Sequence, residues 1–347
     1  MTVSLIEGIA ATLLDQTSSP LELLEAVRRL ADLCESITRV GEAGTDPRQG
    51  EDTFLATGKA VSPLTAARCA RELARTAQFV RGLKAALDEA RQRFPGQTIH
   101  TLYAGCGPYC TLILPLLPLL SADEHRFTLV DIHPLALSSA RTLLEHFHLD
   151  HFIRAYLQAD AAAHDFAASS PIHVAVTETM QQALDKEPQV AVSANLVRYL
   201  EPRGILVPER ITVRLTLIDR RREFTFAPAG EPMPALMERV RVPLSDLMGL
   251  DRQSAPHFPD HLPETTVRFP ANRDRGTLVP VLQTHIRVFG PHELGDYDCS
   301  LTIPKFLKLP AFPEEETDLV FRYRTGGKPG FDYGFVDPVA RAERDST

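Results

Sequence analysis

The chain has 347 residues, of which 44% are hydrophobic and 24% are charged, and its formal net charge is -8. This composition indicates a globular protein with one large or two medium domains, and the negative charge argues against general nucleic-acid binding, which needs a basic face. Five scattered cysteines favour a reducing compartment, and neither a cationic leader nor an apolar run of membrane-spanning length is visible. We therefore expect a cytoplasmic protein that acts without a membrane or a nucleic acid.

Residues 1–95 are predicted to be helical. Ser19, Pro20 and Glu22 form a capping box with proline at the first helical position, which predicts a helix start. An apolar stripe at helical spacing follows, made by Leu23, Leu24, Val27, Leu30, Ala31 and Cys34. Between residues 40 and 59 the sequence GEAGTDPRQGED is polar and rich in helix breakers, so we expect a connecting loop that could close over a site.

A second long helix is predicted to begin at Ser62-Pro63 and to run to about Arg93. Arginines repeat along it at helical spacing, at Arg68, Arg71, Arg75 and Arg81. Two interpretations stay open: a solvated helix face, or a set of cations of which some bind a carboxylate of the cofactor or substrate.

The stretch Thr98 to Pro108, which reads TIHTLYAGCGP, organises the rest of the chain. Its apolar run from Ile99 to Ala104 is typical of a buried parallel strand. Gly105 and Gly107 then allow a tight turn and a close approach of the backbone to a ligand, because a Cβ at either position would obstruct it. Pro108 stands where a helix could start.

Two later strands are predicted to end in acidic residues. Thr128 to Val130 ends in Asp131, and Ala155 to Ala159 ends in Asp160. A glycine turn after the first strand, with a carboxylate after the second that can accept two ribose hydroxyls, is the nucleoside-binding arrangement of doubly wound α/β sheets. The dinucleotide pattern fails, since Cys110 stands where a third small residue is needed.

The AGCGP turn resembles motif I of the class I S-adenosylmethionine (SAM) dependent methyltransferases. The resemblance implies SAM as the cofactor, with its methionine part at the turn, where the cofactor-binding residues would be Tyr103, Gly105, Gly107 and Pro108. It also implies that Asp131 holds the ribose and that Asp160 lies near the adenine.

The segment after this turn, Thr111 to Leu120, reads TLILPLLPLL and predicts a buried helix kinked at its two prolines. Cys106 and Cys110 lie four residues apart, but no second close pair of cysteines completes a metal site, so we expect no metal. The histidines in EHFHLDH form either a ligand cluster or, as we favour, a solvated helix end; they are His146, His148 and His151.

Two glutamates, Glu178 and Glu187, follow a fourth predicted strand that begins at Ile172 and have eight residues between them. Their position and spacing resemble the double-glutamate loop of the arginine methyltransferases, and RYLEPRGILVPER resembles the segment that follows it. In that family the two carboxylates hold a guanidinium by bidentate hydrogen bonds, and the same physics suits any cationic nitrogen. The alternative for Glu187, which precedes Pro188, is an exposed helix end.

Two features depart from that family. The chain has no tryptophan, so the family's threonine-histidine-tryptophan loop is missing. The family's tyrosine-rich N-terminal helix is replaced by a region that offers only Phe54. Both departures argue against a protein substrate.

The C-terminal part, from Arg214 to Arg324, is predicted to be an antiparallel β domain. Its short strands are expected at Glu223 to Phe226, Thr265 to Phe269, Thr284 to Phe289, Cys299 to Ile303 and Leu319 to Tyr323. His285 could line the site, although an ordinary surface or core histidine is the favoured interpretation. The tail from Gly326 onward is expected to be flexible.

The predicted fold is therefore α/β, with a Rossmann-like class I methyltransferase sheet, an N-terminal helical lid and a C-terminal antiparallel β domain. The expected boundaries are 1–95 for the lid, 96–210 for the SAM-binding domain, 211–330 for the β-rich domain and 331–347 for a flexible tail.

We expect methyl transfer to a nitrogen of a small guanidino or amino compound, amino-acid-like and used in secondary metabolism, and the resemblance implies Glu178 and Glu187 as the catalytic residues. One alternative is a cyclase that converts SAM into azetidine-2-carboxylate and methylthioadenosine, with an aromatic ring against the sulfonium from Tyr103, Tyr109 or Tyr199. Another is a non-catalytic SAM-binding partner subunit. A homodimer is compatible with each of them.

Overall fold

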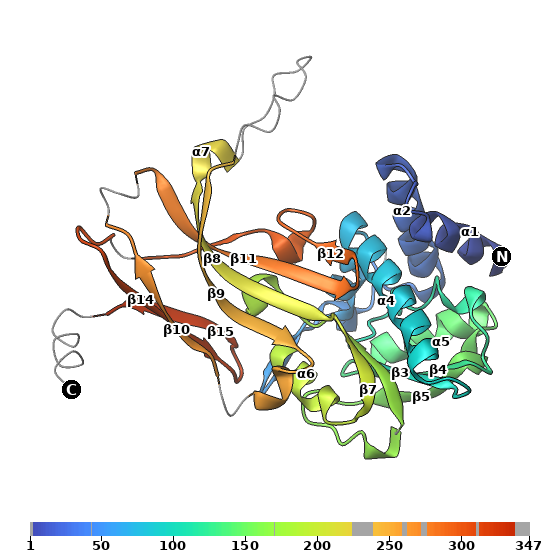
Figure 1. Ribbon diagram of the computed structural model, residues 1–347. Coiled ribbons are helices and arrows are strands. Elements are labelled where there is room, and N and C mark those ends of the chain that lie inside the picture. Colours follow the sequence, from blue (N-terminus) through green and yellow to red (C-terminus); the bar gives the residue numbers. More distant parts are fainter. Residues whose placement is uncertain are drawn as a thin grey trace, which may run out of the picture.

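The computed structural model describes residues 3–42, 44–169, 171–223, 239–258, 262–271, 276–309 and 312–336. They contain a parallel sheet of five strands in the order β5-β4-β3-β6-β7 (Figure 1). The strands are β3 (Ile99–Ala104), β4 (His125–Asp131), β5 (Ile153–Gln158), β6 (Ile172–Thr177) and β7 (Leu200–Val207). The chain direction across the sheet reverses between β3 and β6, and the crevice at that point is where doubly wound sheets bind ligands. The predicted Rossmann-like sheet is confirmed.

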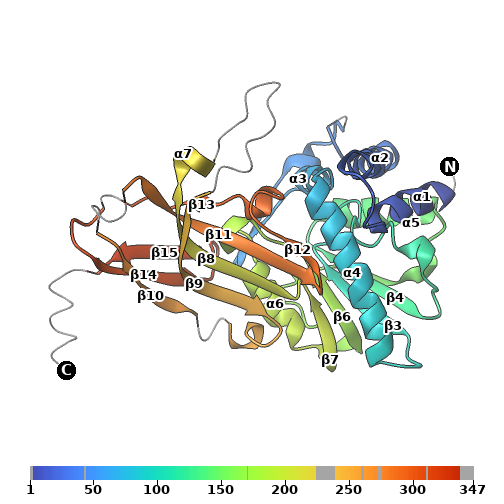
Figure 2. The same cartoon turned by 45° about the horizontal axis from the view of Figure 1, so that its top comes forward.

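Helices cover both faces of this sheet, and successive side chains along β3 pack against different helices. Tyr103 packs in the same core as α4 (Leu73–Arg93) and α5 (Pro134–His146), whereas Leu102 packs in a second core with α6 (Gln189–Val197). Helix α4 also contacts strands of the antiparallel region, so it lies between the two kinds of sheet (Figure 2).

The N-terminal part is mostly helical, as predicted, with α1 (Val3–Leu14), α2 (Pro20–Thr38) and α3 (Pro63–Cys69) before α4. The capping box of α2 is confirmed, since Ser19 Oγ accepts from the Glu22 N–H at 3.3 Å and the Ser19 N–H donates to Glu22 Oε2 at 2.7 Å.

Two expectations for the N-terminal part are corrected. The loop expected between residues 40 and 59 contains a 3₁₀ turn (Pro47–Gly50) and ends in a hairpin of β1 (Thr53–Leu55) and β2 (Gly58–Ala60). The single helix expected up to Arg93 is broken before α4. Glu72, the N-cap residue of α4, has extended backbone angles, and its carboxylate accepts hydrogen bonds from Arg75 and from the Ser300 N–H.

The segment after β3 is buried, as predicted, but it is not a helix. Pro108 and the residues up to 116 form successive turns, followed only by a 3₁₀ turn (Leu117–Leu119), and Cys110 has a φ of 39°. Pro115 and Pro118 have no N–H to donate within a helix, which is why regular structure does not form. The third strand is also displaced, since β5 starts two residues earlier than expected and ends before Asp160.

The antiparallel region consists of two sheets in the described part of the chain. One contains β8 (Arg210–Asp219), β9 (Arg241–Asp251), β11 (Leu278–Phe289) and β12 (His292–Leu294), with β13 (Lys305–Phe306) paired to β11. The other contains β10 (Glu264–Phe269), β14 (Thr317–Arg324) and β15 (Gly330–Phe335). The strands predicted at 265–269, 284–289 and 319–323 are therefore confirmed, whereas the domain boundaries stay predictions.

Three expectations for the antiparallel region are wrong. Cys299 to Ile303 contains a 3₁₀ turn (Ser300–Thr302), because the Thr302 hydroxyl bonds back to the Cys299 backbone. Glu223 ends the short helix α7 (Arg220–Glu223), and residues 224–226 lie outside the described residues. The tail predicted to be flexible from Gly326 contains β15, which pairs antiparallel with β14, and its Tyr333 and Phe335 contact the rings of Phe321 and Phe269. Residues 337–347 lie outside the described residues.

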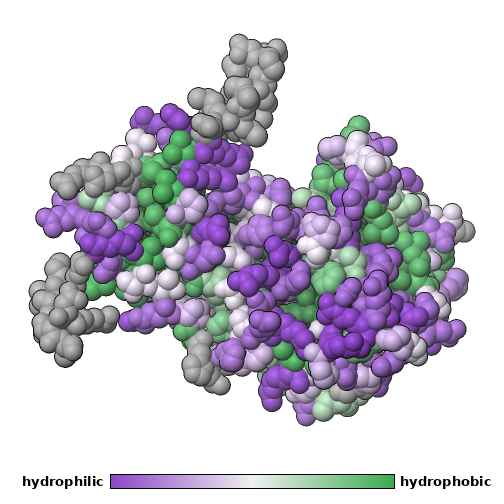
Figure 3. Space-filling model, in the orientation of Figure 1, coloured by the Kyte–Doolittle hydropathy of each residue, from purple (hydrophilic) through white to green (hydrophobic). Residues whose placement is uncertain are grey.

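The surface in Figure 3 is hydrophilic over most of the face shown, with hydrophobic bands on the β-rich side and beside the N-terminal helices. In the described residues, no helix is long and apolar enough to cross a membrane.

Candidate functional site

A cavity of about 470 Å³ lies at the carboxyl ends of the central parallel strands and is covered by the β1–β2 hairpin and α3. Its volume and its mixture of apolar and converging polar groups are typical of a small-molecule site. All eight residues predicted as site residues line it, namely Tyr103, Gly105, Gly107, Pro108, Asp131, Asp160, Glu178 and Glu187. The structure therefore brings together groups that lie far apart in the sequence.

The turn after β3 is tied to the end of β4 through Asp131. Gly105 and Gly107 have φ values of 69° and 64°, and a Cβ on Gly105 would lie 2.5 Å from the Thr179 side chain. Asp131 Oδ2 accepts from the Gly107 N–H and Oδ1 from the His133 N–H, both at 2.9 Å. Burial raises the pKa of Asp131, and these N–H groups act against that rise. Each carboxylate oxygen retains acceptor capacity for a ligand hydroxyl.

Asp160 follows β5 and lines the same cavity. Its Oδ1 accepts from the Ala162 N–H at 2.9 Å, and its main-chain oxygen accepts from the N–H groups of Ala163 and His164. These bonds fix the turn that carries the carboxylate, so Asp160 has a defined position at the edge of the site.

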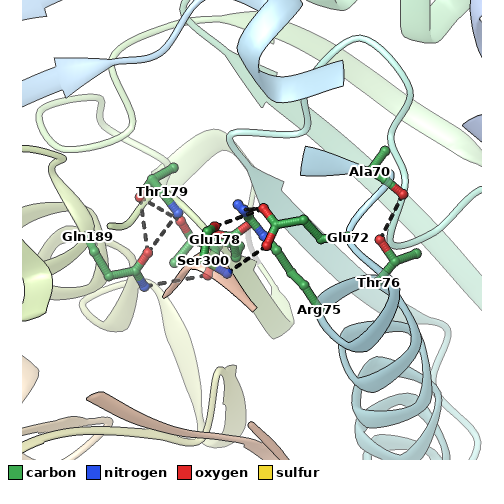
Figure 4. A network of polar contacts seen from close by, with 9 residues as sticks. Ala70, Glu72, Arg75, Thr76, Glu178, Thr179, Gln189 and Ser300 are labelled. Atoms are coloured by element: carbon green, nitrogen blue, oxygen red, sulfur yellow. Dashed lines mark hydrogen bonds and ion pairs between the residues drawn. The ribbon is translucent and has the colours of Figure 1, made fainter. Parts of the chain in front are cut away.

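Arg75 on α4 forms a buried ion pair with Glu178 (Figure 4). Its Nε donates to Glu178 Oε2 at 2.9 Å and its Nη2 donates to the same oxygen, while its Nη1 donates to Glu72 Oε1 at 3.0 Å. Glu72 accepts in turn from the N–H and the hydroxyl of Ser300, both at 2.8 Å. The network joins α4, the loop after β6 and the β-rich part around one end of the cavity.

The Arg75 network decides between the two interpretations of the arginines on the N-terminal helices. Arg75 lines the cavity, whereas Arg71 pairs with Asp32 and Glu35. Arg81 donates to main-chain oxygens at the end of α1, those of Leu13 and Asp15. Arg68 is exposed and lies 3.5 Å from Glu42. Only Arg75 of these four is placed to meet a ligand in the cavity.

Glu178 has one carboxylate oxygen that is not used. Oε2 receives both hydrogen bonds from Arg75, whereas Oε1 is buried and has no hydrogen-bond partner among the described residues. Burial raises the pKa of Glu178, and the charge of Arg75 counteracts this. An unsatisfied buried acceptor costs free energy, so a ligand donor at this position would relieve that cost.

Glu187 is buried at 7% exposure, so the alternative of an exposed helix end is wrong. Burial and the nearby charge of Glu178 raise its pKa to about 7, whereas a hydrogen bond with the Gln181 side chain and the charges of Arg75 and Lys59 act against this rise. A carboxyl group with this pKa exchanges a proton readily near neutral pH.

The loop that carries Glu187 has an unusual backbone. Positive φ values occur at Ala183 (56°), Leu184 (53°) and Lys186 (66°), a conformation that L-residues rarely adopt. Hydrogen bonds hold it in place: Ala183 N–H to Thr284 Oγ1 at 2.7 Å, Tyr323 OH to the Leu184 oxygen at 2.8 Å, and Lys186 N–H to the Pro329 oxygen at 2.9 Å. The β-rich part thus fixes the position of Glu187.

No family model matches the chain, and no curated protein matches it. Among solved structures, it is similar to the Trypanosoma brucei PRMT1 enzyme-prozyme heterotetrameric complex with AdoHcy, at 12% identity and a TM-score of 0.52, over 79% of this chain and 94% of that chain. It is also similar to protein arginine methyltransferase 10 of Arabidopsis thaliana in a uniquely open conformation, at 11% identity and a TM-score of 0.50, over 78% and 96% of the two chains. The chain has the class I fold of these arginine methyltransferases.

The structure decides between the alternatives that the sequence left open for several histidines and tyrosines. His285 does not line the cavity; its side chain is 46% exposed and lies 3.5 Å from Glu293, so it is an ordinary surface histidine. Of the three tyrosines considered for an aromatic contact, Tyr103 lines the cavity, whereas Tyr109 donates to the Val40 oxygen and Tyr199 packs beside Phe166. His146, His148 and His151 are exposed, and the described residues contain no group able to hold a metal ion.

Among the cavity residues that sequence reasoning missed, three have side chains able to bind or orient a ligand. Lys59 is on β2, His133 follows Asp131 and has a buried Nε2 without a partner among the described residues, and Ser300 binds Glu72. His133 could have been found from its position after the second strand. Lys59 and Ser300 gave no local signal, because each reaches the cavity only through the packing of its segment on distant elements.

Proposed function

We propose that the protein is a SAM-dependent N-methyltransferase that acts on a small guanidino or amino compound of amino-acid-like size. The observation that carries the proposal is a pair of carboxylates on one cavity: Glu187 is buried, and Glu178, whose side chain is 12% exposed, has a buried oxygen with no donor in the described part of the chain. A cationic N–H group is the ligand that such a pair favours.

The cavity residues fit SAM. Asp131 retains acceptor capacity for ribose hydroxyls, and Arg75 has two N–H groups beyond its three hydrogen bonds, which suits the cofactor carboxylate. The Trypanosoma brucei neighbour was solved with AdoHcy, the product that methyl transfer leaves. When bound, SAM supplies an electrophilic methyl group on a sulfonium.

The two glutamates would divide the remaining work. Glu178, whose charge Arg75 favours, would hold the cationic group and position the nitrogen that is to be methylated. Glu187, with a pKa of about 7, accepts the proton that the nitrogen must lose. Because the acceptor brings a positive charge, its binding favours the ionised form of Glu187.

The cover of the cavity supports a small acceptor. The β1–β2 hairpin lies on the Glu187 loop, where the Lys59 N–H donates to the Lys186 oxygen at 2.8 Å. A protein chain would need an open groove at this position. Under the proposal the enzyme works in the cytoplasm in secondary metabolism, and a homodimer stays a prediction.

The test is to incubate the protein with SAM, with and without a panel of amines and guanidines, and to identify the products by mass spectrometry. S-adenosylhomocysteine that forms only with an acceptor, together with a methylated amine, is the expected result. Methylthioadenosine and azetidine-2-carboxylate without an acceptor would instead identify the cyclase. SAM binding without any product would identify a non-catalytic subunit.

A further inference from the structure

The β1–β2 hairpin brings a lysine to the acceptor end of the cavity. At Gly58 a Cβ would lie 2.9 Å from the Pro188 nitrogen and 3.1 Å from the Glu187 carbonyl carbon, so only glycine permits this approach. The next residue, Lys59, donates its main-chain N–H to Lys186 and lines the cavity. The hairpin and the Glu187 loop are therefore packed backbone to backbone.

The ammonium group of Lys59 has free bonding capacity. Its Nζ donates to Asp52 Oδ2 at 2.8 Å, the one hydrogen bond that it makes to the described residues, whereas an ammonium has three donors. Asp52 is itself held by the Ser62 N–H at 2.8 Å. The side chains of Lys59 and Asp52 are 24% and 29% exposed, so the pair is partly shielded from water.

The charges around the cavity are unequal. Asp131, Asp160, Glu178 and Glu187 supply four carboxylates, whereas Arg75 and Lys59 are the two Lys or Arg side chains in the described lining. Arg75 is engaged by Glu178 and Glu72 at the start of α4. Lys59 is instead next to the Glu187 loop, at the end where the acceptor would bind.

We propose that Lys59 binds the carboxylate of the acceptor, and that the acceptor is therefore a zwitterionic amino acid with its reacting nitrogen at Glu178 and Glu187. This inference rests on the proposed function. A zwitterion would match both signs of charge in the cavity, because its cationic nitrogen meets the glutamates and its carboxylate meets the two unused ammonium donors. A simple amine would leave Lys59 without an anion beyond Asp52.

The experiment uses two matched pairs of probes that differ by one carboxylate: L-arginine against agmatine, and L-lysine against cadaverine. Acceptor KM and kcat are measured by S-adenosylhomocysteine formation, and binding to the complex with S-adenosylhomocysteine is measured by calorimetry. Lys59→Gln should raise the KM and Kd of the amino acids about 10- to 100-fold, the effect of lost hydrogen bonds to a charged group. Agmatine and cadaverine should change by less than about twofold, with kcat little altered.

Two controls separate charge from packing. Lys59→Arg keeps the cation and should retain most of the preference for the amino acids. Lys84 forms an ion pair with Asp88 on α4, outside the cavity lining. Lys84→Gln removes the same charge there and should leave the KM and Kd of all four probes unchanged.

Three results would overturn the assignment of Lys59. The first is an equal loss of affinity for amino acids and amines in Lys59→Gln, and the second is weaker binding of SAM itself, which would mean that Lys59 binds the carboxylate of the cofactor. The third is that no probe binds to the complex with S-adenosylhomocysteine although that complex forms normally. Absence of S-adenosylhomocysteine binding in the unaltered protein would instead overturn the proposed function.

Discussion

The two ends of the parallel sheet both bury polar side chains and both leave a polar atom without a partner among the described residues, but only at the carboxyl ends do such atoms belong to residues that line the cavity. At the amino ends, the ring nitrogens of His100 contact Thr128 and the Pro171 oxygen, each at 2.8 Å. The ring of His173 accepts from the main-chain N–H of His100 at 3.0 Å and contacts Gln97 at 3.2 Å. At the carboxyl ends, Glu178 has an oxygen without a partner among the described residues. Burial of polar groups therefore does not mark a site, whereas unused bonding capacity beside a cavity does.

The two ends also respond to pH in opposite directions. Burial lowers the pKa of His100, His125 and His173, so the folded state holds fewer protons there and stability is lost as pH falls. Burial raises the pKa of Glu187, so its folded state holds more protons and stability is lost as pH rises toward 7. Each end can thus be tested separately.

The largest effect is expected for Glu178→Gln. The change removes the charge that would hold the acceptor, so kcat should fall about 10²- to 10⁴-fold, while SAM affinity measured by calorimetry stays nearly unchanged. His173→Gln at the opposite end is the matched control, and it should lower the melting temperature without a comparable loss of rate. Rates near those of the unaltered protein in the Glu178 variant would leave that residue with a structural role only.

Asp131→Ala should weaken SAM binding. Loss of hydrogen bonds to the charged group corresponds to about 1.5 to 3 kcal/mol, or about 10- to 150-fold in Kd. The glycine turn also loses its anchor at Gly107. Calorimetry with SAM and with NAD checks both the residue and the cofactor, and tight binding of NAD with no response to SAM would contradict the assignment.

The parts of the fold that the sequence predicted are those determined by neighbouring residues. The turn at Gly105 and Gly107 and the acid after β4 are local patterns of strand ends, and the capping box at Ser19 satisfies its own helix. The strand ends then converge because parallel strands share one carboxyl edge, so the predicted cofactor residues and glutamates could be expected to lie together.

The parts that the sequence did not predict depend on distant contacts. The break before α4 follows from Glu72 binding Arg75 and Ser300, and no breaker residue marks it. The β1–β2 hairpin turns at Ala56-Thr57, which lacks the glycine or asparagine typical of a two-residue turn, so Lys59 was missed. In contrast, the alternation of Phe331, Tyr333 and Phe335 was a visible strand signal within a segment interpreted as flexible.

The amino ends of the sheet should make the protein sensitive to acid. His125 is 3% exposed, its Nδ1 has no partner in the described structure, and burial lowers its pKa to about 4. The unfolded chain, with the usual pKa near 6.5, then binds the proton more strongly, which costs on the order of 2 kcal/mol of stability at pH 5, about 30-fold in the equilibrium constant.

His125→Leu should remove this contribution while the other two histidines keep theirs. Urea unfolding at pH 7 and pH 5 is the measurement, and the variant should lose about 2 kcal/mol less than the unaltered protein between these values. Equal losses in both proteins would show that His125 does not titrate between the folded and unfolded states.

The carboxyl ends should set the pH dependence of the rate. With a guanidino acceptor, which stays protonated throughout this range, kcat/KM should fall below a pH of about 7 as Glu187 becomes protonated, to about a tenth of its plateau at pH 6. The residual rate of Glu187→Gln should lack this acidic limb of the pH–rate profile.

The same substitution should also reduce the loss of folding stability as pH rises through 7, because the buried group no longer has to ionise. A limb that persists in the variant would assign the titration to another group, and its absence from the unaltered protein would remove Glu187 as the base. Because acid weakens the histidine end while it stabilises the folded state through Glu187, rate and stability measured on the same samples distinguish loss of the base from unfolding.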